Sequence, residues 1–136
     1  MGEENVEMQG PQGTIYRQVT VQINDTSDTT LNVNTFGLTY GLWDPAHMPT
    51  NGEQIEPGGN PSFVNYTDKP YTAVSGYITL SPTSGGLITL GWDWKYGSPF
   101  QNTSSAQNTT LGVKSTVVGQ TGTTVTVQYQ ISNQSG

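Results

Sequence analysis

Residues 87–100 read LITLGWDWKYGSPF. Side chains alternate between the two faces of a β-strand, so the first half of this segment places four large apolar residues on one face: Ile88, Leu90, Trp92 and Trp94. Successive apolar residues on one face are typical of a buried side, which favours the first three as core residues over ligand contacts. The segment therefore predicts a half-buried strand.

The aromatic residues at the end of this segment are open to two interpretations. At Trp94 the pattern stops being typical of a core, and residues 95–99 read as a turn that carries Trp94 and Tyr96 away from the strand. Trp and Tyr rings in a loop suit either a membrane interface or the face of a sugar. For Trp94, Tyr96 and Phe100 a structural role and a binding role are equally open. We expect Trp43 to be more exposed than buried.

The same alternation recurs along the chain and predicts seven or eight short strands. The cleanest example is residues 123–131, with four residues expected to face inward: Val125, Val127, Tyr129 and Ile131. Other strands are expected at residues 15–23, 31–42, near 55, 63–66, 74–80, 87–94 and 111–118. No segment of about ten residues or more has helical periodicity. This pattern predicts an all-β chain that forms a single antiparallel β-sandwich without substantial helix.

The length of 136 residues, without a break in composition, predicts one domain. We expect a flexible N-terminal tail at residues 1–13, the sandwich at residues 14–132 and a C-terminal tail at residues 133–136. The chain has no cysteine, so a disulfide or a thiolate metal site is excluded.

The formal charge of -6, with only four cationic residues, leaves no basic stripe to neutralise phosphates, so we expect no nucleic-acid partner. Anionic membranes are disfavoured for the same reason, whereas zwitterionic headgroups are compatible. No run of about 18 apolar residues occurs, and the chain starts with acidic rather than basic residues. We expect a soluble protein, cytoplasmic or secreted without a conventional signal peptide.

Residues typical of catalysis are scarce. The single histidine, His47, lies between two prolines in a polar loop, and no phosphate loop or nucleophile elbow occurs. Asp25 and Asp28 read as turn formers. We therefore expect no enzyme activity, no cofactor and no metal ion.

Residues 92–98 read WDWKYGS and resemble the W-D-C-P-W-G-S signature of the aegerolysins, small acidic β-sandwich proteins of fungi and bacteria. Further segments resemble family motifs in the same order. Residues 19–30 are similar to the family's opening strand, 38–42 to its S-W-G-K segment, 55–59 to its I-x-P-G-G, and 75–80 to its E-G-x-F-D-L strand. The resemblance implies a sandwich of the aegerolysin and actinoporin type.

The resemblance covers about residues 15–132 and implies a protein that recognises membranes. Such a protein binds sphingolipid headgroups, with or without a sterol, and recruits a larger pore-forming partner at a target cell membrane. The chain is also similar in pattern to the small component of bacterial two-component insecticidal toxins. It departs from the signature where Trp94 and Lys95 replace Cys-Pro, and where Tyr40 and Tyr96 replace family tryptophans.

From this resemblance we expect seven lipid-binding residues: Tyr40, Trp43, Asp93, Trp94, Lys95, Tyr96 and Ser98. The four aromatic residues would lie at headgroup depth, Asp93 and Ser98 would bond the headgroup, and Lys95 would meet its phosphate. One alternative is a carbohydrate-binding module, because the same aromatic faces stack on sugars. A second alternative is an assembly subunit, because the outward faces are rich in Thr, Asn and Gln.

Overall fold

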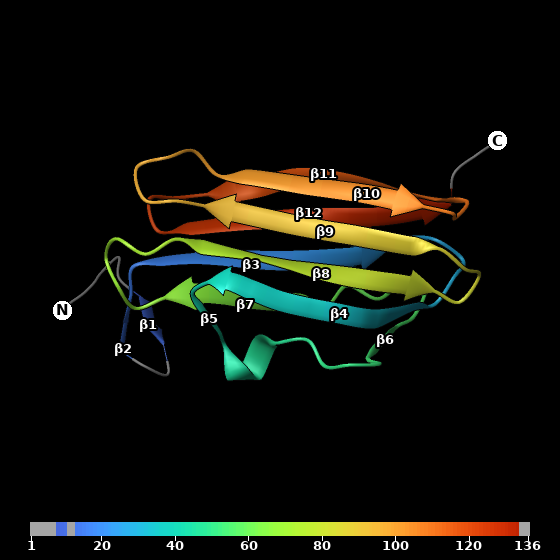
Figure 1. Ribbon diagram of the computed structural model, residues 1–136, viewed down its shortest axis with the longest axis horizontal. Helices are drawn as coiled ribbons and strands as arrows, with labels where there is room; N and C mark the ends of the chain where they lie inside the picture. The colour runs from blue at the N-terminus through green and yellow to red at the C-terminus, as the bar shows by residue number, and fades with distance from the viewer. Residues whose placement is uncertain (1–7, 11–12, 134–136) are drawn as a thin grey trace.

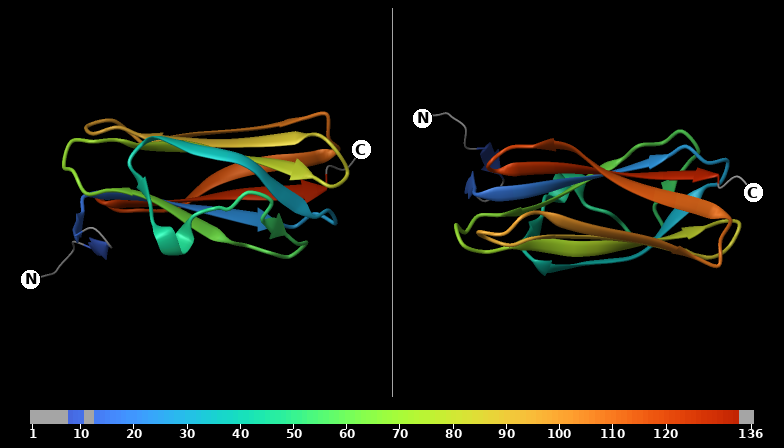
Figure 2. Two further views of the ribbon diagram at one scale, coloured as in Figure 1. Left: turned by 60° about the horizontal axis from the view of Figure 1, so that its bottom comes forward. Right: turned by 90° about the horizontal axis from the view of Figure 1, so that it is seen from above.

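The chain folds into two five-stranded β-sheets that lie face to face, seen here in a computed structural model (Figure 1). The structure describes residues 8–10 and 13–133. The first sheet, which we call the β9 sheet, has the order β10 (Gln101–Gln107), β9 (Leu87–Trp94), β8 (Val74–Pro82), β4 (Leu31–Tyr40) and β6 (Gln54–Ile55). The second, the β3 sheet, has the order β11 (Leu111–Gln120), β12 (Thr124–Asn133), β3 (Arg17–Asp25), β7 (Ser62–Thr67) and β5 (Leu42–Trp43). Figure 2 shows them as separate layers, which confirms the predicted β-sandwich.

Three small elements lie outside these sheets. The strands β1 (Met8–Gly10) and β2 (Gly13–Ile15) pair antiparallel with each other. A single turn of 3-10 helix, η2 (Pro45–His47), follows β5. Part of the expected N-terminal tail thus falls within β1 and β2, whereas its other residues, and residues 134–136 of the C-terminal tail, lie outside the described residues.

The core between the sheets is formed by the residues that alternation placed inward. Val125, Val127, Tyr129 and Ile131 of β12 have no exposed surface, and neither do the inward residues of β3, which are Val19, Val21 and Ile23. From the opposite sheet, Ile88, Leu90 and Trp92 of β9 are also buried. The predicted core side of these strands is confirmed.

Two features of the sheets differ from the sequence prediction. The neighbours β12 and β3 run parallel, although an antiparallel sandwich was expected. These strands lie at opposite ends of the chain, so no hairpin forces them to be antiparallel. The strand β10 was not predicted, because its sequence QNTSSAQ has no large apolar residue to mark an inward face. It pairs with β9 at the edge of its sheet.

The strand directions bring several loops together at one end of the sandwich. The strands β4 and β9 end there and β3 and β8 begin there, at the left of Figure 1. Gly41, with a φ of 89°, turns the chain from β4 in one sheet to β5 in the other. A Cβ atom at Gly41 would lie 2.6 Å from the Asn65 amide nitrogen and 2.8 Å from the Tyr66 carbonyl oxygen, so a larger residue would be crowded there. This corner fixes the position of Tyr40.

Candidate functional site

A hollow with a volume of about 510 Å³ opens at this end of the sandwich. It is lined by residues from the end of β4, the loop before β8 and the turn after β9: Tyr40, Tyr71, Thr72, Ala73, Lys95 and Tyr96. We call it the tyrosine hollow, and this end of the sandwich the tyrosine end. Its volume lies within the range that small-molecule pockets occupy.

The three tyrosines of the hollow are exposed. Tyr40 has 49% of its surface accessible, Tyr71 has 73% and Tyr96 has 58%. The rings of Tyr71 and Tyr96 meet edge to face, with centroids 4.8 Å apart and an interplanar angle of 87°. Each ring combines an apolar body with a polar hydroxyl, so the hollow presents an amphipathic aromatic surface to solvent.

Arg17, at the start of β3, holds the walls of the hollow together. Its Nη1 donates to the carbonyl oxygen of Thr72 at 2.6 Å and its Nη2 donates to the carbonyl oxygen of Pro70 at 2.7 Å. The guanidinium carbon lies 5.2 Å from the centroid of the Tyr96 ring. Arg17 is itself buried. It therefore joins the loop before β8 to the turn after β9 through hydrogen bonds and a cation–π contact.

Lys95 is the cationic group of the hollow. Its Nζ donates to Oδ2 of Asp93 at 2.8 Å. This hydrogen bond, together with the negative charge of Asp93, raises the pKa of Lys95. The side chain is exposed, and it stays charged at neutral pH beside the tyrosine rings.

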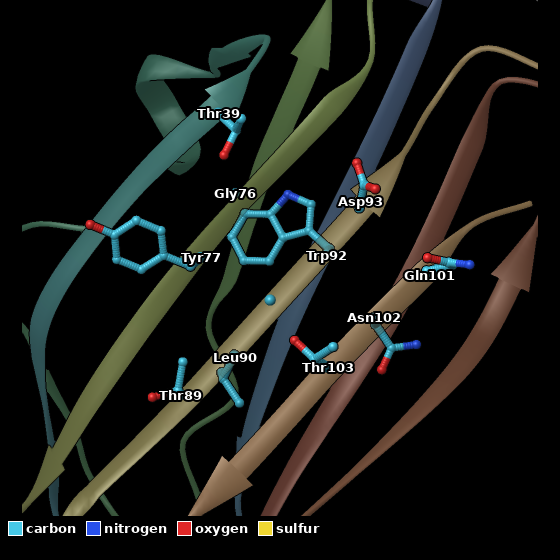
Figure 3. Close-up of a pocket in the computed structure, with 11 residues that line it drawn as sticks. Thr39, Gly76, Tyr77, Thr89, Leu90, Trp92, Asp93, Gln101, Asn102 and Thr103 are labelled. Atoms are coloured by element: carbon cyan, nitrogen blue, oxygen red, sulfur yellow. The ribbon is translucent and has the colours of Figure 1, made fainter. Parts of the chain in front are cut away.

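The structure brings three of the seven expected lipid-binding residues, Tyr40, Lys95 and Tyr96, together in one hollow. Asp93 instead lines a second hollow, on the outer face of the β9 sheet (Figure 3). Ser98 is exposed in the turn after β9, where its backbone N–H donates to the Lys95 carbonyl oxygen at 3.0 Å, but it does not line the tyrosine hollow.

The two expected tryptophans lie elsewhere. The prediction that Trp94 leaves the core is wrong, because it is the last residue of β9, continues the inward alternation and is only 8% exposed. Trp43 is half-buried, and its ring packs edge to face against Phe36 and Trp92 with centroids 6.1 Å apart in both cases. The Trp94 ring thus belongs to the core and the Trp43 ring packs against its edge, whereas the three tyrosines of the hollow are exposed.

Sequence reasoning missed four residues around the hollow: Arg17, Tyr71, Thr72 and Ala73. A signal for the last three was present. An antiparallel hairpin of β8 and β9 pairs Val74 with Trp94, so the residues before β8 must lie beside those after β9. Arg17 gave no such signal, because it falls at an inward position of a strand that carries no other charged residue before Asp25.

His47 is the single histidine of the chain and the residue through which a catalytic triad would have to run. His47 Nδ1 lies 2.9 Å from Asp44 Oδ2 on the surface of η2, and no serine hydroxyl within residues 13–133 bonds this imidazole. In the same part of the chain, no group of three or more His, Asp and Glu residues is arranged to hold a metal ion. No helix among the described residues is long and apolar enough to cross a bilayer.

Two solved structures resemble this fold closely. The lipid-binding protein Nakanori matches with a TM-score of 0.68 and 15% sequence identity, over 86% of this chain and 71% of that one. The RahU protein, solved in complex with a TRIS molecule, matches with a TM-score of 0.68 and 14% identity, over 89% of this chain and 98% of that one. No protein-family model and no curated protein matches the chain. At these identities the comparisons show that the chain shares the neighbours' fold.

Proposed function

We propose that this protein binds lipid membranes through its tyrosine end and holds a zwitterionic sphingolipid headgroup in the tyrosine hollow. The observation that carries the proposal is the grouping of three exposed tyrosines with one lysine in a hollow of headgroup size. Tyrosine hydroxyls and rings are suited to the boundary between headgroups and acyl chains.

The two charges of a zwitterionic headgroup each find a partner in this hollow. A quaternary ammonium or ammonium group is attracted to the faces of Tyr40, Tyr71 and Tyr96 by cation–π interactions. The headgroup phosphate accepts a charge-assisted hydrogen bond from Lys95. Because Asp93 already neutralises Lys95, the hollow offers little net positive charge to purely anionic lipids.

We further propose that the protein is the recognition component of a pore-forming or insecticidal two-component cytolysin. Three observations support this: the motif resemblance to aegerolysins, the shared fold, and the description of the neighbour Nakanori as a lipid-binding protein. The described residues form a closely packed sandwich in which nearly every strand belongs to one of the two sheets. Such a fold recognises lipid and leaves the pore to a larger protein partner.

Co-sedimentation with liposomes tests the proposal. The lipids are phosphatidylcholine alone, sphingomyelin with cholesterol, and ceramide phosphoethanolamine, each at two salt concentrations. We expect binding to one sphingolipid mixture that changes little with salt. Tyr96→Ala should weaken that binding roughly tenfold, because it removes both a ring face and the contact with Tyr71. Val118→Ala, which removes an exposed apolar side chain of β11 outside both hollows of the sandwich, is the control.

The same experiment separates the proposal from its alternative. Binding to none of the three lipid mixtures by the folded wild-type protein contradicts a lipid function. Saturable binding on a glycan array, combined with that result, would instead support a carbohydrate-binding module. Equal liposome binding by wild type and Tyr96→Ala would place the lipid contact outside the tyrosine hollow.

A further inference from the structure

The second hollow has a volume of about 410 Å³ and lies on the outer face of the β9 sheet, over β8, β9 and β10 (Figure 3). We call it the outer-face hollow. It exists because position 91 has no side chain. A Cβ atom at Gly91 would lie 2.7 Å from Oγ1 of Thr103 on the neighbouring strand, so any larger residue would fill the space. The Tyr129 hydroxyl, from the opposite sheet, donates to the Gly91 carbonyl oxygen at 2.5 Å and holds this part of β9 in place.

Polar side chains around this hollow retain hydrogen-bonding capacity. Within the described part of the chain, the side chains of Thr89, Gln101, Asn102 and Thr103 bond to no other protein group. Asp93 uses Oδ2 to accept from Lys95, and its Oδ1 has no donor among residues 13–133. Hydroxyl, amide and carboxylate groups together supply both donors and acceptors over a small area.

The remainder of the same sheet face is different. There the hydroxyls of Thr35 and Thr79 bond each other at 2.6 Å, and the Thr79 hydroxyl also accepts from the Thr35 backbone N–H at 2.9 Å. Ser75 donates to the Trp92 carbonyl oxygen at 3.2 Å. The hydroxyls of Thr35, Thr79 and Ser75 are thus bonded within the protein, whereas those of Thr89 and Thr103 are available to a ligand.

One aromatic ring borders the outer-face hollow. Tyr77 of β8 reaches across toward β4 (Figure 3), where a Cβ atom on Gly37 would lie only 2.9 Å from the ring carbon Cε1. The ring therefore occupies the space that a side chain at position 37 would need. Tyr77 is 42% exposed, so part of the ring is accessible beside the hollow.

From this arrangement we propose that the outer-face hollow is a binding site for a pyranose sugar. A pyranose has an apolar face of C–H groups, which the Tyr77 ring can cover, and hydroxyls that both donate and accept hydrogen bonds. The amide of Gln101, the hydroxyls of Thr89 and Thr103 and the carboxylate of Asp93 match those hydroxyls. The site does not depend on the tyrosine hollow, and none of its lining residues lines that hollow.

The first arm of the test uses soluble sugars. The ¹⁵N-labelled full chain is titrated with the methyl glycosides of glucose, galactose, mannose and N-acetylglucosamine, and backbone amide shifts are recorded by NMR. We expect one of these sugars to cause saturable shifts confined to residues 76–77, 89–93 and 101–103. Gly91→Ala should weaken this binding roughly tenfold by filling the hollow. Gly119→Ala is the control, because a methyl group there meets no atom within 4 Å.

The second arm asks whether the sugar is carried by a lipid. Phosphatidylcholine vesicles with and without glucosylceramide are sedimented with the Tyr96→Ala variant, which weakens the tyrosine hollow alone. Binding that requires glucosylceramide and is lost in Tyr96→Ala/Tyr77→Ala supports a glycolipid source. Saturable shifts in the first arm without such binding support a soluble glycan.

The proposal is overturned by any of three results. The first is that no glycoside causes saturable shifts and no vesicle binding depends on glucosylceramide. The second is that the shifts map to Tyr40, Tyr71 and Tyr96 instead of the outer-face hollow. The third is that Tyr77→Ala binds the sugar with unchanged affinity. The last variant keeps the test decisive even where Gly91→Ala fails to fold, because Tyr77 is a surface residue. Failure of this proposal leaves liposome binding by the wild-type protein unaffected, so the two functions are judged separately.

Discussion

The two ends of the sandwich are built from similar loops but use their polar groups differently. At the end opposite the tyrosine hollow, which we call the turn end, the side chains of residues 25–30, Glu56 and Asn133 bond one another. Thr30 donates to Glu56 at 2.8 Å, and Asn133 donates to Asp28 at 3.1 Å. The tyrosine end instead leaves three tyrosine rings and a lysine at the surface of a hollow.

Cationic and acidic residues are also distributed unevenly between the tyrosine end and the turn end. Three of the four cationic residues of the chain, Arg17, Lys69 and Lys95, lie in or beside the loops of the tyrosine end. Acidic residues dominate the turn end, including Asp25, Asp28 and Glu56. Groups that bond within the protein contribute to stability, whereas groups left open can contact a ligand. The comparison therefore favours our proposal that a ligand binds at the tyrosine end, whereas the polar groups of the turn end bond within the protein.

The largest expected effect concerns the interior of the tyrosine end. Trp94→Ala removes a buried indole beneath the hollow and should lower the free energy of unfolding by about 3–5 kcal/mol. Tyr96→Ala, two residues further along, should lower it by only about 1 kcal/mol, because the exposed ring loses its contacts with Tyr71 and Arg17 but leaves no buried cavity. Urea unfolding followed by tryptophan fluorescence measures both. Similar small losses in the two variants would mean that Trp94 is not a core residue.

Loss of the Arg17 anchor should have the next largest effect. Arg17→Met keeps the aliphatic length of the side chain but leaves the carbonyl oxygens of Pro70 and Thr72 without their donor, which should cost about 1.5–3 kcal/mol. Hydrogen exchange of the amides at residues 71–73 should become faster while that of β12 stays slow. Lys69→Met, which removes an exposed cation from the same loop, is the control. Unchanged exchange at residues 71–73 would show that other contacts hold the loop.

Most of the fold could be predicted from the sequence because buried strands carry a period-two signal. The strands β3, β8, β9 and β12 each place at least three apolar residues inward at every second position, and those residues are buried. This period-two signal is absent from a strand that joins the sheet through backbone hydrogen bonds but contributes no apolar side chains to the core. The edge strand β10 needs no apolar face, so its Thr, Ser and Gln residues resembled a loop.

The site could be predicted only in part, because burial depends on where a strand ends. Tyr40, Lys95 and Tyr96, which the sequence analysis grouped, line one hollow, but Trp94 was expected to leave the core although it is buried as the last residue of β9. The outer-face hollow left no sequence signal of its own. It depends on Gly91 facing Thr103 across two strands, and that register becomes visible only when β10 is recognised as a strand.

A smaller effect is expected from the cation of the tyrosine end. Lys95→Ala should weaken sphingolipid binding roughly two- to fivefold, because an exposed ion pair contributes little and the tyrosine rings remain. The hydrogen bond to Asp93 raises the pKa of Lys95, so the lysine stays protonated and wild-type binding should be constant between about pH 6 and 9. Liposome sedimentation across this range checks both statements. A loss of binding within it would point to a different titrating group.

The smallest expected effect belongs to the turn end. Asp25 is fully buried; its Oδ1 accepts from the backbone N–H of Ser27 at 3.0 Å and from the Ser27 hydroxyl at 2.6 Å. Its Oδ2 has no hydrogen-bond partner in the described part of the chain. Burial raises the pKa of Asp25, and the nearby Glu56 adds to this, although the bonds from Ser27 lower it.

A raised pKa in the folded state fixes the sign of the pH dependence. The contribution of Asp25 to stability is fully present below the pKa of an unfolded aspartate, about 3.9, and is lost as the pH rises through the higher folded value. Asp25→Asn keeps an acceptor for Ser27 but cannot ionise, so its stability should fall less than that of wild type as the pH rises from about 4 to 7. Asp28→Asn removes one charge from the same turn at an exposed position and controls for net charge.

The amide nitrogen that Asp25→Asn introduces also lacks an acceptor. The pH dependence of the free energy of unfolding, measured with urea, is therefore compared between the variants rather than its absolute value. If the free energy of unfolding changes with pH equally in wild type and Asp25→Asn, this carboxyl ionises as easily in the folded protein as in the unfolded chain. Burial in the turn end would then not disfavour its charged form.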